Sequence, residues 1–396
     1  MDAPSHIVTI PMGTRCRVAV VLGTRPEAIK MAPVVRALDR RDDRFERLVI
    51  TTSQHREMLA QAMGAMGLRA DLDLGLTHIN RTLAEFTAHA LLALQRALAE
   101  IRPHLLLVQG DTSTVASAAL AAFYQGIPIG HVEAGLRSGD MRRPFPEEAN
   151  RRIASVVTDL HFAPTETARA NLLREGIPSG DVFVTGNTVV DALQSVPARA
   201  RFDEPALDAV DWHRRRVLLV TVHRRENLGE NLHDLCRAFK RLVMRHQDIE
   251  IVFPVHLNPA VREVVFAELH EVPGITLLDP ISYPDLLEVM RRCYLVLSDS
   301  GGIQEEAPAL QKPILILRNV TERPEVVQAG FGRLVGTDSD AVATTTSNLL
   351  QDPAAMRRMT AGRNPFGDGR AAERIVRIVE QRFGLPIEHR AAAIGA

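Results

Sequence analysis

The sequence predicts an α/β protein with two Rossmann-like domains, each a doubly wound parallel sheet, that face a cleft. Three observations lead to this fold class. A length of 396 residues is typical of two domains. Short apolar runs alternate with amphipathic helical patterns, as in parallel sheets that helices cover on both faces. The alternation stops at residues 194–212, which contain prolines, mixed polar residues and the single tryptophan, and then it restarts.

The first domain is expected to span residues 1–193. It opens with a strand at residues 17–23 (RVAVVLG), followed by a helix with Pro26 near its start. Proline is favoured there because the first helical positions need no backbone N–H donor. The same pairing of strand and helix then repeats. Further strands are predicted at residues 47–52, 105–110, 127–132, 159–164 and 182–187.

The second domain is expected to span residues 194–370. Its strands are predicted at residues 216–222, 250–255, 275–280, 294–300 and 313–318. The last helix, residues 371–383, has no strand after it, and we expect residues 371–396 to pack back on the first domain. Because parallel strands end at the same sheet edge, the loops after them should line the cleft.

Composition excludes several classes of partner. The 47 basic and 48 acidic residues nearly cancel, so there is no bulk field for nucleic acid or membrane. The 3 cysteines are far apart in sequence, which argues against a disulfide framework or a zinc site and favours a reducing compartment. No signal-peptide pattern and no apolar run of membrane-spanning length is seen. We therefore expect a cytoplasmic protein.

Two loops of the first domain carry side chains suited to anions or protons. Arg25 supplies a fork of donors beside a predicted helix N-terminus, which favours an anion, and Lys30 lies along that helix. Lys30 stands out because nearly all other basic residues are arginine. Asp111 adjoins another predicted helix start, but Thr112 and Ser113 are also available as caps. The Asp111 carboxylate is therefore available for another role.

The most informative stretch is residues 131–152 (HVEAGLRSGDMRRPFPEEANRR). Glu133 stands just past a predicted strand, and Glu147 and Glu148 stand in the first turn of the next helix. Open α/β sheets keep their chemistry at such positions, although a helix N-terminus also favours glutamate for electrostatic reasons. We expect Glu148 to be a helix-start or interface charge.

Two loops of the second domain indicate a nucleotide sugar. His223 directly follows a predicted strand and precedes Arg224, so a polar site is favoured over a structural histidine. Residues 300–302 (Ser-Gly-Gly) lie between a strand and a helix, where their backbone N–H groups can face phosphates. Glu306 would then suit a ribose diol, and Arg323 could close over the same place.

Several cofactor motifs are missing from the sequence. No GxGxxG follows the first strand and no GxxxxGK[ST] occurs, which disfavours NAD and ATP. HExxH and paired CxxC motifs are also missing, which disfavours zinc. We expect neither a cofactor nor a metal.

The chain resembles the non-hydrolysing UDP-N-acetylglucosamine 2-epimerases. The likeness is carried by long segments in order, among them GTRPEAIKMAPV, QGDTSTVASAALAAFYQGIPIGHVEAGLRSGD, PFPEEANRR, VHRRENLGEN and DSGGIQEEAP, and runs from about Val18 to about Phe383. It implies the GT-B fold, a homodimer, and interconversion of UDP-GlcNAc and UDP-ManNAc. The family's reaction eliminates and re-adds UDP through an enzyme-held glycal.

The resemblance also implies roles for individual residues. The acid/base candidates fall on Asp111, Glu133, Glu147 and His223. The nucleotide and phosphate contacts fall on Arg25, Ser300, Gly301, Gly302, Glu306 and Arg323, with Lys30 close to the sugar. Glu133 and Glu147 should face the sugar, and Arg137 should bind substrate. Some members bind a second UDP-GlcNAc as an activator, and Gln54, Arg224 and His256 match parts of that site. Glu57 and Asn80 depart from its pattern, where a glutamine and an arginine are expected.

The chemistry explains why an acidic cluster is expected. The proton at sugar C2 is not next to a carbonyl, so acid/base help of about 10²–10⁴-fold per group is not enough alone. UDP must leave first or nearly so, and donors that stabilise the leaving pyrophosphate assist this step. Re-protonation from the opposite ring face then needs a second proton carrier.

Other functions remain open from the sequence. A GT-B glycosyltransferase shares the fold but would leave UDP-GlcNAc unchanged without an acceptor. A hydrolysing epimerase would release free ManNAc. A 2-epimerase of a related UDP-sugar, such as a diacetamido uronic acid, would use the same site, and a sensor without enzymatic activity would leave the acidic positions unexplained.

Overall fold

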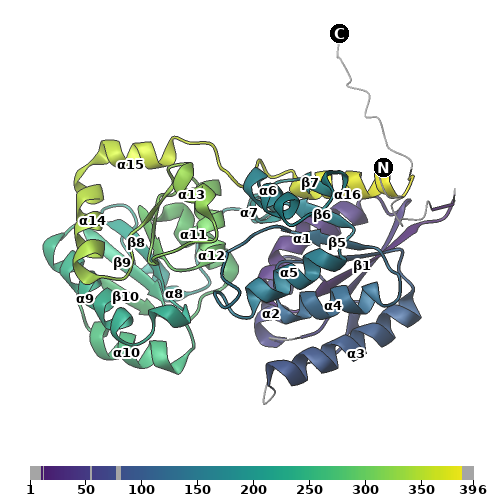
Figure 1. Cartoon of the computed structure of the whole chain (residues 1–396). Helices are drawn as coiled ribbons and strands as arrows, with labels where there is room; N and C mark the ends of the chain where they lie inside the picture. Colours follow the sequence, from purple (N-terminus) through teal and green to yellow (C-terminus); the bar gives the residue numbers. More distant parts are fainter. Residues whose placement is uncertain (1–9, 12, 54–55, 77–81, 386–396) are drawn as a thin grey trace, which may run out of the picture. The chain divides into compact units, whose positions relative to one another are not determined.

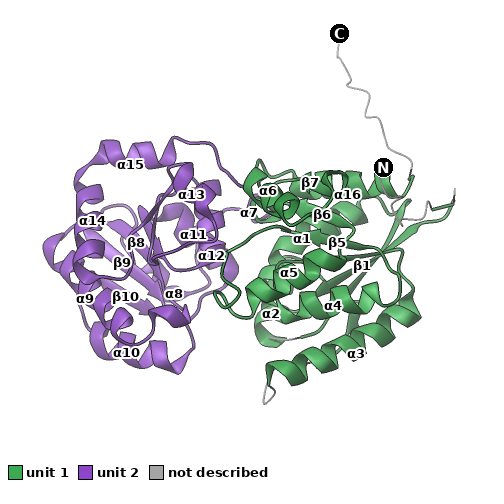
Figure 2. Ribbon diagram, viewed as in Figure 1, with its two compact units in different colours: residues 1–192, 367–396 green, residues 193–366 purple. Residues whose placement is uncertain are grey.

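The computed structural model describes residues 10–11, 13–53, 56–76 and 82–385. Gln54 and Asn80 lie outside the described residues. The chain divides into two compact units, which are coloured separately in Figure 2. Unit 1 comprises Met1–Ala192 and Gly367–Ala396, and unit 2 comprises Leu193–Phe366. The chain thus passes from one unit to the other twice.

Unit 1 is built on a seven-stranded parallel sheet with the order β3-β2-β1-β4-β5-β6-β7 (Figure 1). The order reverses between β1 and β4, which makes this pair the topological switch point where open α/β sheets bind ligands. The strands are β1 (Cys16–Leu22), β2 (Phe45–Thr51), β3 (Leu72–Asp73), β4 (Leu105–Gln109), β5 (Ile129–Val132), β6 (Leu160–Ala163) and β7 (Val182–Val184).

Helices cover both faces of this sheet. On one side, α3 packs against α4 and α4 against α5, over a core of valine, leucine and alanine side chains. On the other, α1 contacts α2 and the C-terminal helix α16, where Arg44 lies 2.9 Å from the buried Glu380. The helices are α1 (Arg25–Asp39), α2 (Arg56–Ala65), α3 (Leu83–Ile101), α4 (Ser113–Phe123), α5 (Glu147–Val157), α6 (Glu166–Arg174), η1 (Ser179–Asp181), α7 (Thr188–Ser195) and α16 (Ala371–Arg382).

Unit 2 repeats the same topology with six parallel strands in the order β10-β9-β8-β11-β12-β13. The strands are β8 (Arg216–Thr221), β9 (Ile249–Pro254), β10 (Ile275–Leu278), β11 (Leu295–Ser298), β12 (Ile314–Ile316) and β13 (Gly332–Leu334). Around them lie α8 (Pro205–Asp208), η2 (Arg225–Asn227), α9 (Glu230–Arg245), α10 (Pro259–Leu269), α11 (Tyr283–Arg292), α12 (Gly301–Ala309), α13 (Pro324–Gln328), α14 (Ser339–Gln351) and α15 (Pro353–Thr360).

The segment that leads into unit 2 is packed against it. The ring of Phe202 stacks on Trp212 at 5.4 Å between centroids, and the guanidinium of Arg292 lies 4.6 Å above the Phe202 ring. Asp285 accepts hydrogen bonds from the backbone N–H groups of Asp203 and Glu204. The single tryptophan therefore serves to attach this segment to α11.

The predicted fold class is confirmed, since both units are α/β with parallel sheets. Two strands had escaped prediction, β3 and β13, and each is a short strand at one edge of its sheet. None of the described helices combines the length and apolar character needed to cross a membrane. Each of the three cysteines is free and buried.

Candidate active site

The predicted site residues of unit 1 lie where strands end and helices begin. Arg25 begins α1 after β1, Asp111 follows β4, Glu133 follows β5, and Glu147 begins α5. Because β1, β4 and β5 are neighbours in the sheet, these positions share its carboxyl edge at the switch point.

Glu133 is held in a strained, buried position. Its φ of 65° lies in the left-handed region, which non-glycine residues seldom occupy outside turns and functional sites. The carboxylate forms an ion pair with the buried Lys30 of α1. The same oxygen, Oε2, accepts a hydrogen bond of 3.1 Å from Nδ2 of Asn187. The lysine that stood out in the sequence is thus the charge partner of a predicted acid/base residue.

Asp111 is held by an arginine of α5. Its Oδ2 lies 2.5 Å from Arg151, which also lies 3.0 Å from Glu148. Asn150 donates to the backbone oxygen of Asp111 at 3.0 Å, so two consecutive residues of α5 orient this loop. Glu148 is completely buried, so it is a structural charge of α5 and not an exposed interface charge, which corrects that part of its prediction.

Glu27 joins the loops after β1 and β4. Its carboxylate accepts hydrogen bonds from the backbone N–H groups of Gly23 and Thr24 at 2.6 Å and from the Thr112 hydroxyl at 2.6 Å. Burial raises the pKa of the Glu27 carboxyl to about 7, against the opposing effect of these donors. Gly23 is required here because a Cβ at this residue would stand 2.3 Å from Oγ1 of Thr114.

The remaining predicted residues of unit 1 differ in how they are held. The Arg25 side chain is half-buried and, within the part of the chain that the structure describes, has no hydrogen-bond or ion-pair partner. Arg137 is engaged: its guanidinium donates two hydrogen bonds to Glu175, of 2.8 and 2.7 Å, and one to Ser155. Glu147 is half-buried at the first position of α5.

Two histidines lie behind this edge on adjacent strands. His131 of β5 and His161 of β6 are paired in register, and both are completely buried. The Nε2 atom of His131 lies 2.7 Å from the Gly110 oxygen, so this ring orients the loop that carries Asp111. Burial lowers the pKa of His131 to about 4 and that of His161 to about 3. Both rings are therefore neutral at physiological pH.

This histidine pair should make the fold labile to acid. The folded-state pKa of each ring is depressed, so its contribution to stability is complete above the unfolded value of about 6.5 and is lost as pH falls toward 4. For His131 alone the loss is up to about 3 kcal/mol. The raised pKa of Glu27 acts in the opposite direction between pH 7 and 4.5. The histidine effect is therefore measured as the difference in the pH dependence of the free energy of unfolding between wild type and a histidine variant.

A variant isolates the effect of His161, whose side chain is completely buried. His161→Leu should flatten the dependence on pH while keeping the fold. The same substitution at the exposed His89 is the control and should leave the slope unchanged. An unchanged slope in His161→Leu would contradict the prediction.

Asp299 organises the site residues of unit 2. This fully buried carboxylate follows β11 and accepts hydrogen bonds from the backbone N–H groups of His223 and Arg224, at 3.0 and 2.9 Å. Nδ1 of His223 lies 3.0 Å from the other carboxylate oxygen. Burial raises the pKa of Asp299, but the contacts with His223 and Arg224 outweigh it, so the net shift is downward. Asp299 thus joins the His223 loop to the turn that begins α12.

The predicted phosphate turn is built around Gly301. Ser300 is the N-cap of α12, and a Cβ on Gly301 would stand 2.5 Å from the Arg323 guanidinium. Arg323 is buried and pinned by Glu305 at 2.5 Å and Glu322 at 2.8 Å. Gly302 has more room, because the nearest atom to a Cβ there is Oγ of Ser300 at 3.8 Å. The N-terminus of α12, with its free backbone N–H groups, is suited to an anion, and the Arg323 guanidinium lies beside it.

The other predicted residues of unit 2 also follow strands, at the carboxyl edge of the sheet. Glu306 is buried and accepts a hydrogen bond of 3.1 Å from the Tyr283 hydroxyl. Arg224 is half-buried and lies 3.6 Å from Glu322, the carboxylate that also holds Arg323. His256 is exposed after β9, and its ring stacks on His223 at 5.7 Å.

Several of these residues were missed by reasoning from the sequence. Asn187, Arg151, Asp299 and Glu322 orient the predicted residues, and none of them was assigned a role. A signal existed for two of them. Asp299 immediately precedes the Ser-Gly-Gly turn, and Asn187 lies in the polar segment VTGN at the end of a predicted strand.

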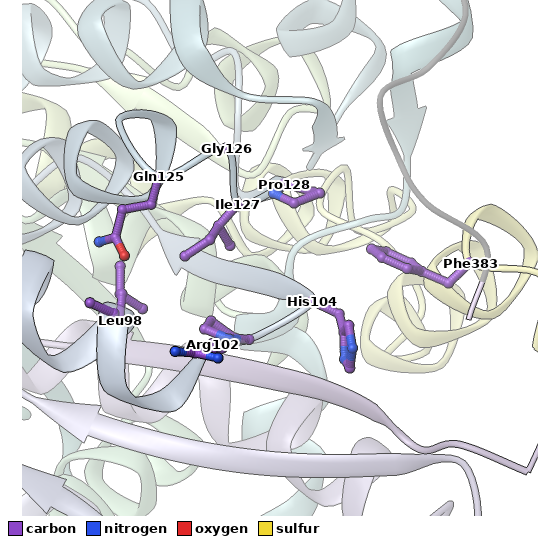
Figure 3. A pocket seen from close by; sticks show the side chains of 10 residues that line it. Leu98, Arg102, His104, Gln125, Gly126, Ile127, Pro128 and Phe383 are labelled. Atoms are coloured by element: carbon purple, nitrogen blue, oxygen red, sulfur yellow. The ribbon is translucent and has the colours of Figure 1, made fainter. Parts of the chain in front are cut away.

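A cavity of about 530 Å³ in unit 1 lies away from these residues (Figure 3). It is lined by Leu98, Arg102, His104, Gln125, Ile127 and Phe383, among others. These residues precede β4 and β5 or belong to helix ends, so the cavity opens at the amino edge of the sheet, opposite Asp111 and Glu133. Among the described residues, no cluster of three or more His, Cys, Asp or Glu could hold a metal ion.

Comparisons with known proteins agree on one family. A family model described as UDP-N-acetylglucosamine 2-epimerase matches residues 36–380. The UDP-N-acetylglucosamine 2-epimerase of Escherichia coli K12 is 46% identical over 370 residues, which are 91% of this chain and 97% of the relative. That of Bacillus subtilis is 44% identical over 93% of this chain and 96% of the relative. The crystal structure of the Neisseria meningitidis enzyme bound to UDP-GlcNAc is 42% identical and superimposes with a TM-score of 0.88, covering 92% of this chain and 100% of that one.

Proposed function

The chain belongs to the UDP-N-acetylglucosamine 2-epimerase family, and we propose that it interconverts UDP-GlcNAc and UDP-ManNAc by inverting carbon C2 of the sugar. The observation that carries this proposal is the pair of carboxylates that follow the neighbouring strands β4 and β5. Each is oriented by a buried cation, Asp111 by Arg151 and Glu133 by Lys30. Two oriented carboxylates at one sheet edge suit a reaction that removes and returns a proton.

The reaction proceeds by elimination and re-addition. The bond between C1 and the UDP oxygen breaks with its electron pair leaving on UDP, and loss of the C2 proton to a base gives the glycal. UDP then re-adds at C1 while a proton reaches C2 from the opposite ring face. One carboxylate on one face cannot carry out both transfers, so at least two proton carriers are required. We assign these roles to Asp111, Glu133, Glu147 and His223.

The leaving pyrophosphate needs positive groups that are already in place. We assign its binding to Arg25, Arg323 and the backbone N–H groups of residues 300–302. Arg323 lies against Gly301 and keeps its orientation through Glu305 and Glu322. Groups that are held before the charge develops need no reorganisation during the reaction, which is why they lower the barrier. Glu306 is assigned to the ribose.

Five further residues are assigned to the sugar, to the substrate or to a second nucleotide sugar. Lys30 is assigned to the sugar side through its ion pair with Glu133. Arg137 is assigned to substrate binding, although its guanidinium donates to Glu175 and Ser155 in this structure. A site for a second UDP-GlcNAc would use Arg224 and His256, together with Gln54, which lies outside the described residues.

The function is tested by proton NMR of the purified protein with UDP-GlcNAc in D₂O. We expect UDP-ManNAc to form with deuterium at C2 and without added NAD or metal. Free ManNAc would indicate a hydrolysing enzyme, and unchanged UDP-GlcNAc at high concentration would contradict the function. A related UDP-sugar that turns over faster would identify a different physiological substrate.

We propose that the protein is a homodimer through the face formed by α3, α4 and α5. This face carries exposed apolar side chains, namely Leu92, Phe123, Tyr124, Ile153 and Val156. The three helices pack side by side, α3 against α4 and α4 against α5. Exposed apolar patches of this kind mark interaction sites in soluble proteins.

Val156→Glu should disrupt this dimer. The Val156 side chain is 80% exposed, so the substitution adds charge to the interface without disturbing the core. We expect a monomer by sedimentation velocity, with the dimer dissociation constant raised at least tenfold, or about 1.4 kcal/mol. Met244→Glu is the matched control, because Met244 is 74% exposed on α9 of unit 2. Equal effects of the two substitutions would place the interface elsewhere.

We also propose that the protein acts in the cytoplasm. Its three cysteines are free and buried, as expected in a reducing compartment. Cell fractionation would test this, and recovery in a membrane or secreted fraction would contradict it.

A further inference from the structure

We propose that Asn187 is a positioning residue for the Glu133 carboxylate, and that the chain's return into unit 1 at Gly367 holds Asn187 in place. The inference rests on the acid/base role proposed for Glu133. It concerns two residues to which the sequence analysis assigned no role, one before α7 and one before α16.

The orientation of the Asn187 amide is determined by its hydrogen bonds. Its Oδ1 accepts a hydrogen bond of 3.0 Å from the backbone N–H of Val189, so the NH₂ group must point the other way. That group donates to Oε2 of Glu133 at 3.1 Å. Asn187 is only 2% exposed, so water does not compete for these contacts. The amide is therefore a fixed donor aimed at one carboxylate oxygen.

Two donors from different elements orient Glu133. Lys30 reaches Oε2 from α1, and Asn187 reaches it from the loop between β7 and α7. Glu133 has a left-handed backbone, which only its surroundings can maintain. A single flexible lysine supplies charge but allows the carboxylate to rotate about it. The second, rigid donor from Asn187 removes that freedom.

The loop that carries Asn187 is held by the segment returning from unit 2. The chain leaves unit 1 after Ala192 and returns at Gly367, and both crossings lie close to Asn187. Gly367 has a φ of +112°, and a Cβ there would stand 3.2 Å from the Cα of Gly186. Contact with backbone cannot be relieved by rotating a side chain, so another residue at 367 requires a shift of the backbone at this contact, which is next to Asn187.

Two polar contacts tie the same segments together. Asp191 accepts hydrogen bonds from the backbone N–H groups of Ala371 and Ala372, at 3.1 and 2.9 Å, and so caps α16. Arg374 donates to the backbone oxygen of Thr185 at 3.0 Å. These contacts thus hold the returning segment against the loop whose Asn187 amide donates to Glu133.

Asn187→Ala should lower kcat for the epimerisation at least tenfold while changing KM less than threefold, since Glu133 remains but loses its orientation. In the Glu133→Gln background the same substitution should cause no further loss. Asn171→Ala is the matched control. Asn171 donates to the backbone oxygen of Gly135 at 2.9 Å, so it holds the same loop without touching the Glu133 carboxylate.

Asn187→Asp distinguishes loss of the hydrogen bond to Glu133 from loss of the space that the Asn187 side chain fills. The new carboxylate would stand beside Glu133, and both would share Lys30 as their cation. The other charged groups of the adjoining segments are engaged elsewhere: the Asp191 carboxylate caps α16, and the Arg374 guanidinium pairs with Asp368. At lower pH the new group is protonated and donates to Glu133 again. The activity of this variant relative to wild type should therefore rise as pH falls from 8 to 6, whereas the ratio for Asn187→Ala should stay constant.

Gly367→Ala tests the second half of the inference. It should reproduce the loss of kcat seen for Asn187→Ala. Gly176→Ala is the control, because Gly176 has a similar φ of +88° but nothing within 4 Å of a Cβ. Equal activity of the Gly367 and Gly176 variants would overturn the role of the returning segment.

The outcomes distinguish the two levels of the proposal. If Glu133→Gln keeps wild-type activity, the proposed role of Glu133 fails. If Glu133→Gln is inactive while Asn187→Ala stays within twofold of wild type, the role of Glu133 stands and the inference about Asn187 is wrong. A ratio for Asn187→Asp that does not change with pH would also contradict it.

Discussion

Glu133→Gln is expected to lower kcat for epimerisation of UDP-GlcNAc by about 10²–10⁴-fold, the range lost when a general acid or base is removed. The amide is isosteric with the carboxylate, so the site keeps its shape but loses the base. Turnover and deuterium incorporation at C2, followed together by NMR, should fall in parallel. Turnover within a few-fold of wild type would show that Glu133 does not carry the proton.

The same substitution changes stability, which needs its own control. Glu133 is the charge partner of the buried Lys30, and removing one member of a buried ion pair costs about 3–5 kcal/mol. The double variant Lys30→Met, Glu133→Gln removes both charges and should recover most of that stability. Its activity should remain lost. Recovery of stability without activity would show that the loss of activity does not come from unfolding.

Gly301→Ala is expected to raise KM for the UDP-sugar at least tenfold, equivalent to about 1.4 kcal/mol of binding. The new Cβ would stand 2.5 Å from the Arg323 guanidinium, which cannot yield easily because Glu305 and Glu322 hold it. A displaced Arg323 would lose the contact with the pyrophosphate that we propose for it, and a hydrogen bond to a charged group is worth about 1.5–3 kcal/mol. Steady-state kinetics and calorimetry with UDP would measure the effect.

Gly302→Ala distinguishes displacement of the Arg323 guanidinium from disruption of the turn at residues 300–302. A Cβ at Gly302 meets only Oγ of Ser300, at 3.8 Å, so Arg323 stays in place and stability should not fall. Any rise in KM for this variant therefore reports on the backbone N–H groups alone. A Gly301 variant that binds no more weakly than the Gly302 variant would contradict the role assigned to Arg323.

Most of the fold could be predicted because parallel sheets leave a strong signal in sequence. Buried strands such as β4 and β8 are continuous apolar runs, and each is followed by a helix with a recognisable start. β3 and β13 could not be predicted in this way. They have two and three residues, lie at sheet edges and are largely exposed, so their sequences show no apolar run.

The predicted end of β7 was also wrong for a physical reason. The sequence predicts a strand to Asn187, but β7 ends at Val184. Thr185 still pairs its backbone N–H with Ala163, and the chain then turns at Gly186, with a φ of +88°, so that Asn187 points toward Glu133. A polar residue at the end of a strand gives no indication of whether it continues the strand or serves a site.

By itself the sequence determined the fold class and the family, because these depend on local patterns and long motifs. It also predicted that the candidate site residues follow strands at the carboxyl edge of each sheet, which is where the structure has them. Lys30 could even be singled out as the one lysine near the site. Only the tertiary structure decided which groups are paired. Lys30 with Glu133, Arg151 with Asp111 and Asp299 with the His223 loop are far apart in sequence, and no local pattern encodes such pairs. Long-range pairing follows from how strands align in the sheet, so it becomes visible only when the chain is folded.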